Sequence, residues 1–119
     1  MRVFADTFYW IALTDSADEF HVRAREVRRD IVTTDEVLTE YLTFFCAAPE
    51  FIRREVALAV EDILKHPAVK VISQSRESFL GGLRISRDIS MQTMRREGLT
   101  DALTNDRHFE QEGFCALFR

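Results

Sequence analysis

Three acidic side chains stand where a fold could bring them together. Asp6 directly follows the short β-prone run 2–5, and Asp106 comes two residues after the β-prone run 102–104. Glu40 lies beside the apolar stripe of a predicted helix. A carboxylate in such a place is costly to bury unless it is paired or bound to a cation. We therefore expect the three carboxylates to converge on one site.

Carboxylate oxygens are the ligands that Mg²⁺ and Mn²⁺ prefer in proteins. A cation held by them can polarise a phosphodiester and lower the pKa of an attacking water. The same residues also have a plainer interpretation, in which each aspartate caps a turn or a helix and the glutamate is solvated. Spacing alone leaves both interpretations open.

Other polar residues stand next to these acids. The hydroxyls of Thr7 and Thr104 can hold the neighbouring carboxylates in place, or they can simply cap the strand ends. His108 follows Asp106 closely, and we favour a hydrogen-bonded structural role over a general base or an RNA contact. Exposed arginines are candidates for phosphate contact, because the guanidinium fork matches phosphate oxygens. They are Arg95, Arg96 and Arg107. Arg95 and Arg96 also suit the C-terminal end of a helix dipole.

The apolar runs predict strands that alternate with helices. Strands are expected over 2–5, 31–33, 69–72, 102–104 and 114–118. Helices are expected over 7–13, 16–27, 34–45, 49–64, 75–83 and 89–97, the last ended by Gly98. Ser16 with Glu19, and Thr33 with Glu36, have the spacing of capping boxes that open helices. Short apolar strands in this order predict an α/β fold with a mainly parallel sheet between two layers of helices. Ligands of such sheets bind at the carboxyl ends of the strands.

Composition narrows the class of protein. The chain has 119 residues, so we expect one domain over residues 1–119. Its 16 basic and 20 acidic side chains give a net charge of −4, which argues against a general nucleic-acid coat protein. Without a membrane-spanning apolar stretch or the apolar core of a signal peptide, a cytoplasmic location is expected. Cys46 and Cys115 lie in apolar runs, so both are expected to be reduced core residues.

Three acidic motifs, in order along the chain, resemble those of PIN domains. The first is Val3-x-x-Asp6-Thr7-x-x-Trp10-Ile11-Ala12-Leu13. The second is Thr33-Thr34-x-x-Val37-Leu38-x-Glu40. The third is Leu103-Thr104-x-Asp106-x-His108-Phe109-x-x-x-Gly113-Phe114. Together they cover nearly the whole chain, and the nearest resemblance is to the VapC-like toxin ribonucleases of type II toxin–antitoxin systems.

That resemblance implies an endoribonuclease, a hydrolase dependent on Mg²⁺ or Mn²⁺, in a PIN-like three-layer fold. It also implies an RNA substrate, a homodimer and a small antitoxin partner, with no role for a membrane. Asp6, Glu40 and Asp106 match the catalytic acidic positions of the family, and Asp6 and Asp106 match its metal ligands. An aromatic-rich stretch that includes Tyr41 and Phe44 either packs in the core or forms part of a dimer or antitoxin groove.

The chain departs from the family between Leu80 and Ser90. Counted back from Asp106, Arg87 stands where relatives have another active-site aspartate, and Asp88 is one residue late. One residue turns a helix by about 100°. Either residues have been lost, leaving Asp88 as a substitute metal ligand or the site weakened, or a loop that carries the aspartate is missing from the sequence.

Two alternatives to a ribonuclease follow. A catalytically weakened PIN-like binding module is favoured by the change near Asp88. A receiver-like phosphoacceptor domain also gathers acids at strand ends. It would need a lysine after the last strand, and the only lysines of the chain are Lys65 and Lys70. We therefore rank it last.

Overall fold

Five parallel strands form the centre of the protein in the computed structural model, which describes residues 2–77, 80 and 89–119. The strands are β1 (Val3–Ala5), β2 (Ile31–Thr34), β3 (Val69–Ile72), β4 (Asp101–Leu103) and β5 (Cys115–Ala116). Their order in the sheet is β3-β2-β1-β4-β5, and all neighbouring pairs are parallel. The predicted α/β architecture is thus confirmed, with a sheet that is wholly rather than mainly parallel.

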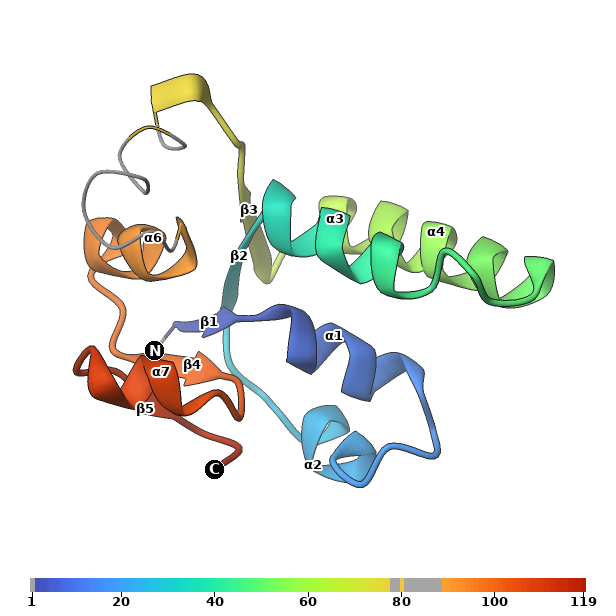
Figure 1. Cartoon of the computed structure of the whole chain (residues 1–119), viewed down its shortest axis with the longest axis horizontal. Helices are drawn as coiled ribbons and strands as arrows, with labels where there is room; N and C mark the ends of the chain where they lie inside the picture. Colours follow the sequence, from blue (N-terminus) through green and yellow to red (C-terminus); the bar gives the residue numbers. More distant parts are fainter. Residues whose placement is uncertain (1, 78–79, 81–88) are drawn as a thin grey trace.

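Helices flank the sheet on two sides. They are α1 (Thr7–Thr14), α2 (His21–Arg25), α3 (Asp35–Phe44), α4 (Glu50–Lys65), α6 (Ile89–Glu97) and α7 (Arg107–Gln111). In Figure 1, α1, α3 and α4 lie on one side of the strands and α6 lies on the other. Among the described residues, no helix combines the length and the apolar character needed to cross a membrane.

The central strand β1 is the most completely buried. All three of its residues are inaccessible to solvent. Phe4 is paired with Val32 on one side and with Ala102 on the other. Burial on both faces explains the uninterrupted apolar run, since strands of parallel sheets are covered by helices above and below. The first polar residue after this strand therefore emerges at the middle of the carboxyl edge.

Helix starts differ from two of the sequence predictions. Helix α2 begins at His21 rather than near Ser16, because the Asp18 carboxylate accepts a hydrogen bond from the Phe20 N–H (2.8 Å) and holds the preceding residues in a turn. Helix α3 is capped by Thr34, whose hydroxyl accepts from the Val37 N–H (3.1 Å). The predicted cap, Thr33, instead remains in β2.

Thr33 has a different partner because the strand is one residue longer than expected. Its hydroxyl donates to the carbonyl of Ala5 (2.9 Å) and so links β2 to β1. The indole N–H of Trp10 in turn donates to the Thr33 hydroxyl (3.4 Å). A buried hydroxyl needs such partners, and here they tie α1 to the sheet beside the first acidic residue.

Both cysteines are exposed, so their predicted place in the core was wrong. Cys46 lies in the turn that follows α3, where the apolar run leaves the helix. Cys115 belongs to the edge strand β5, which spans two residues rather than the predicted 114–118. An apolar run at a sheet edge or a helix end has one open side, and sequence periodicity does not reveal which residue faces it.

The C-terminal half contains one confirmed helix end and one prediction that falls largely outside the described residues. Gly98 has a φ of +69° and follows α6, and the Leu99 N–H donates to the carbonyl of Met94 (2.8 Å), as in a glycine C-cap. The predicted helix 75–83 lies mainly outside the described residues, although residues 76, 77 and 80 are helical.

Candidate active site

Asp6 and Asp106 lie at the carboxyl edge of adjacent strands. Asp6 follows β1 directly and stands at the N-cap of α1, while Asp106 follows β4 and stands at the N-cap of α7. Because β1 and β4 pair in parallel, with Ala5 opposite Leu103, the chain leaves both strands at the same edge. Two acids far apart in the sequence are thereby placed at neighbouring strand ends.

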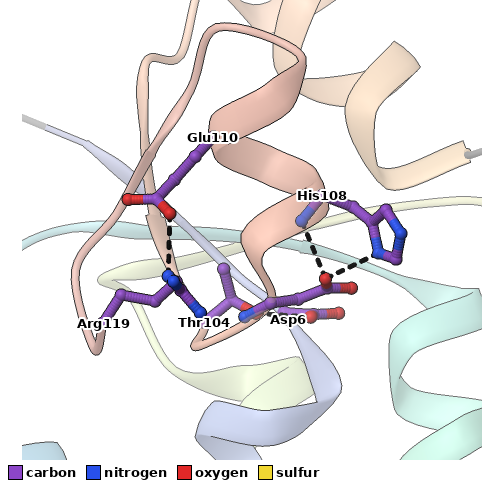
Figure 2. A network of polar contacts seen from close by, with 6 residues as sticks. Asp6, Thr104, His108, Glu110 and Arg119 are labelled. Carbon is purple, nitrogen blue, oxygen red and sulfur yellow. Dashed lines mark hydrogen bonds and ion pairs between the residues drawn. The ribbon is translucent and has the colours of Figure 1, made fainter.

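The Thr104 side chain joins these two acidic positions. Its hydroxyl donates to Oδ2 of Asp6 (2.9 Å) and accepts from the backbone N–H of Asp106 (3.2 Å). Thr104 is fully buried. Figure 2 shows Thr104 beside Asp6 at the base of the network. One threonine thus fixes the Asp6 carboxylate relative to the backbone that carries the other acid.

Asp106 itself is held by His108. Its Oδ1 accepts from the backbone N–H of His108 (2.9 Å) and lies 2.8 Å from Nδ1 of the His108 ring (Figure 2). The ring donates to this oxygen when its proton is on Nδ1. Phe109 is buried next to it, and its ring contacts that of Phe114 at 6.4 Å between centroids. These contacts agree with the predicted hydrogen-bonded role of His108 in a turn held by the two phenylalanines.

Glu40 reaches the same region from α3. Its Oε2 accepts from the Thr7 hydroxyl (2.8 Å), at the first residue of α1. The side chain is exposed, as in the plainer of the two interpretations, so Glu40 carries no burial cost. Helix α3 buries Val37 and Tyr41, whereas Glu40 lies on the solvent-exposed side of that helix.

All three predicted acids line one cavity of about 330 Å³. It is lined by Asp6, Glu36, Val37, Glu40, Ile89, Ser90, Asp106 and Phe109. Glu36 is a lining residue that the sequence predictions did not include in the site. Glu36 and Glu40 are four residues apart on α3, and this spacing places both on one face of the helix.

The cavity offers oxygen donors of the type that hard divalent cations need. Hydrogen bonds from described residues engage Oε2 of Glu40 and Oδ1 of Asp106, and leave the second oxygen of each without such a bond. Within residues 2–77, 80 and 89–119, however, no three His, Cys, Asp or Glu side chains lie close enough together to hold a metal ion. Asp88, the fourth predicted acid, lies outside the described residues. The donor chemistry therefore fits such a cation, while the described residues alone do not complete its ligand set.

The three arginines predicted to contact RNA are exposed, and none of them is among the described residues that line the cavity. Arg95 lies over the ring of Phe114, with 5.2 Å from its guanidinium carbon to the ring centroid. Nη2 of Arg95 also lies 3.7 Å from Oε1 of Glu112. Arg96 lies in the last turn of α6, and Arg107 begins α7 directly after Asp106. Only Arg107 is next in sequence to a lining acid.

No family model matches the chain, and no curated protein matches it either. Among solved structures, it is similar to VapC20 from Mycobacterium tuberculosis, which is described as a sarcin–ricin loop cleaving toxin. The two chains superimpose with a TM-score of 0.76 over 97% of this chain and 98% of the other, at 22% sequence identity. A match of this extent at this identity establishes the fold. The resemblance drawn from the three acidic motifs is thereby confirmed in its structural part: the chain has the PIN fold of the VapC toxins.

Proposed function

We propose that this protein is a metal-dependent endoribonuclease that hydrolyses RNA phosphodiesters at the acidic cavity. The observation that carries the proposal is that Asp6, Glu40 and Asp106 line one cavity at the carboxyl edge of a PIN-type sheet. Structural likeness to an RNA-cleaving toxin supports the same conclusion. Like charges gather in one pocket only at a cost in electrostatic energy, and a bound cation would offset that cost.

Asp6 and Asp106 are the residues that would hold Mg²⁺ or Mn²⁺, with Asp88 as a further ligand. Such a cation would supply charge neutralisation at the phosphate and a water of lowered pKa. Thr104 and Thr7 keep one oxygen of Asp6 and of Glu40 in a fixed direction through their hydroxyls. Such supporting hydrogen bonds matter because a ligand that can rotate binds less tightly.

The substrate class that we propose is structured RNA, with the sarcin–ricin loop as its first candidate because VapC20 cleaves it. The net charge of −4 disfavours attraction of RNA by the protein as a whole, so binding would depend on local arginines. Arg107 is the best placed, and Arg95 and Arg96 are proposed as more distant phosphate contacts.

An antitoxin and a second copy of the chain are proposed to bind the aromatic-rich stretch around Tyr41, Phe44 and Phe51, here called the aromatic surface. Of its residues, Tyr41 is buried, whereas Phe44 on α3 and Phe51 on α4 are 62% and 64% exposed. Exposed aromatic side chains are commonly covered by a protein partner. We propose that residues 1–119 act as one domain and work in the cytoplasm with these partners.

The test is cleavage of total RNA and of a sarcin–ricin stem-loop, with Mg²⁺, Mn²⁺ or a chelator. Wild type is expected to cleave only with a cation, and Asp6→Asn is expected to lower the cleavage rate by about a hundredfold or more. Asp62→Asn, which changes an exposed acid of α4, is the matched control and should cleave like wild type. A folded wild type that cleaves no RNA with either cation would overturn the proposal.

A catalytically weakened binding module is the second candidate. It is favoured by the finding that the described residues do not bring three metal-type ligands together. Binding of the stem-loop without cleavage, and unchanged by Asp6→Asn, would identify such a module. If wild type retains some cleavage, Asp88→Asn tests whether Asp88 replaces the missing family aspartate as a metal ligand. A loss of cleavage rate equal to that of Asp6→Asn would identify Asp88 as the substitute ligand, and an unchanged cleavage rate would exclude it.

A further inference from the structure

We infer that residues 117–119, here called the C-terminal strap, position the acidic pair from behind the cavity, with Phe118 and Arg23 as positioning residues. This inference rests on the proposed function for its consequence, though not for its structural test. No strap residue is among the described residues that line the cavity. Any effect of the strap on the site must therefore pass through the elements that it contacts.

The first contact is with the backbone of β4 and the residues after it. The Leu117 N–H donates to the carbonyl of Ala102 (2.9 Å), and the Phe118 N–H donates to the carbonyl of Thr104 (3.1 Å). Both bonds come from the turn that directly follows β5. Thr104 is thus held through its backbone by the strap, while its hydroxyl holds Asp6 and the N–H of Asp106.

The second contact is with the first turn of α1, the helix whose N-cap is Asp6. The Phe118 ring is 4% exposed, and its centroid lies 5.6 Å from that of Phe8 and 6.4 Å from that of Tyr9. Edge contacts of this kind add to the burial of apolar area. Phe118 therefore joins the helix that Asp6 caps to the segment after β4 that carries Thr104.

Arg23 of α2 fastens the strap from outside. Its Nη2 donates to the carbonyl of Leu117 (2.9 Å), and its guanidinium carbon lies 4.8 Å from the centroid of the Phe118 ring. A guanidinium over an aromatic face is attracted to the ring electrons. Because this hydrogen bond is exposed, a change at Arg23 should loosen the strap without opening the core.

The third contact is with α7, the helix whose N-cap is Asp106. Nε of Arg119 lies 2.7 Å from Oε1 of Glu110 on that helix (Figure 2). The strap thus touches the three elements that carry Asp6, Thr104 and Asp106. Ligand positions must hold to about half an ångström for tight binding, so a looser strap should weaken the site before it weakens the fold.

The variants are Arg23→Ala and Phe118→Leu, with Arg25→Ala on the same helix as the matched control. Arg25 is exposed, and its side chain has no hydrogen bond or ion pair to a described residue. Amide hydrogen exchange at Asp106 and His108 reports directly on the network, because the Thr104 hydroxyl and the Asp106 carboxylate accept from these two N–H groups. Mn²⁺ affinity by calorimetry and the separation of kcat from KM provide the functional measurements.

We expect Arg23→Ala and Phe118→Leu to speed exchange at these two amides and to weaken Mn²⁺ binding by about three- to tenfold. The rate kcat should fall with KM unchanged, and amides of β1 should exchange as in wild type. Exchange and Mn²⁺ affinity at wild-type values in both variants would overturn the inference. If the wild-type protein neither binds Mn²⁺ nor cleaves RNA, the proposed function fails, and the exchange measurement still decides the role of the strap.

Discussion

Acidic residues at the two edges of the parallel sheet have different bonding partners. At the amino edge, Oε1 of Glu97 lies 2.9 Å from Nζ of Lys70 and 3.4 Å from Nη1 of Arg2. Asp101 is paired there with Arg29 at 3.0 Å. At the carboxyl edge, threonine hydroxyls donate to Asp6 and Glu40, and His108 holds Asp106.

Under the proposed function, this difference is between acids paired with basic side chains and acids available to a ligand. Hydroxyl donors orient the carboxylates of Asp6 and Glu40 without cancelling their charge. In the described part of the chain, no Lys or Arg forms an ion pair with Glu40 or Asp106. Glu40 and Asp106 are thus oriented but not paired with a basic side chain of the described residues, and such acids can bind a cation. Glu97 and Asp101 are already paired with basic side chains.

The largest expected effect is loss of cleavage on neutralising the carboxyl edge. Asp6→Asn and Asp106→Asn keep the shape of the side chain and remove its charge, so each should lower the cleavage rate by about a hundredfold or more. Glu40→Gln should lower the cleavage rate less, because the Glu40 side chain is exposed to solvent. Cleavage of the stem-loop and thermal unfolding are measured in parallel. An unchanged cleavage rate in Asp6→Asn would show that the carboxyl-edge acids are no more important for cleavage than those of the amino edge.

A second test is stabilisation by the cation alone. Mn²⁺ at about a hundred times its dissociation constant should add about 2.7 kcal/mol to the free energy of unfolding, because it binds only the folded state. Melting curves of wild type and Asp6→Asn, each with and without Mn²⁺, check this. Asp101→Asn, at the opposite edge, should keep the full Mn²⁺ shift; equal shifts in all three proteins would place the binding elsewhere.

A smaller effect is expected from the hydroxyl that holds the acids. Thr104→Val keeps the volume but removes the bond to Asp6, so the cleavage rate and Mn²⁺ affinity should fall by about tenfold. Thr7→Val removes the bond to Glu40 and should cost less. Calorimetric titration with Mn²⁺ measures both. A Thr104→Val protein with wild-type affinity would show that the buried bond contributes only to folding.

The smallest effect belongs to the amino edge. Glu97→Gln should lower the free energy of unfolding by no more than about 1 kcal/mol and leave cleavage intact. The hydrogen bond from Lys70, with the help of Arg2, holds the pKa of Glu97 below its ordinary value of 4.5. The folded pKa is depressed, so this contribution is full above pH 4.5 and is lost as the pH falls through the folded pKa.

Unfolding of wild type and Glu97→Gln by urea at neutral and at acidic pH measures this contribution. The difference in free energy between the two proteins should shrink as the solution is acidified below the folded pKa. A difference that grows on acidification would contradict the assigned sign. Reduced RNA cleavage in Glu97→Gln would show that the two edges are coupled.

The sequence by itself determined the order of strands and helices and the positions at which acids follow strands. Uninterrupted apolar runs require burial on two faces, and the first charged residue after such a run must leave the sheet. Asp6 and Asp106 could be predicted at the same edge of the sheet on these grounds. Their proximity to Glu40 around one cavity also agrees with the sequence, while the chemical roles of the three remain predictions.

Only the tertiary structure decided which side chains support the acids and which face solvent. The bond from Thr104 to Asp6 joins residues 98 positions apart, and it exists because β4 pairs with β1 in one particular register. The place of Glu36 in the cavity depends on the rotation of α3, and the exposure of Cys115 depends on β5 lying at an edge. Periodicity sets local backbone conformation, but contacts across the fold are set by strand order and helix rotation, which a local pattern does not contain.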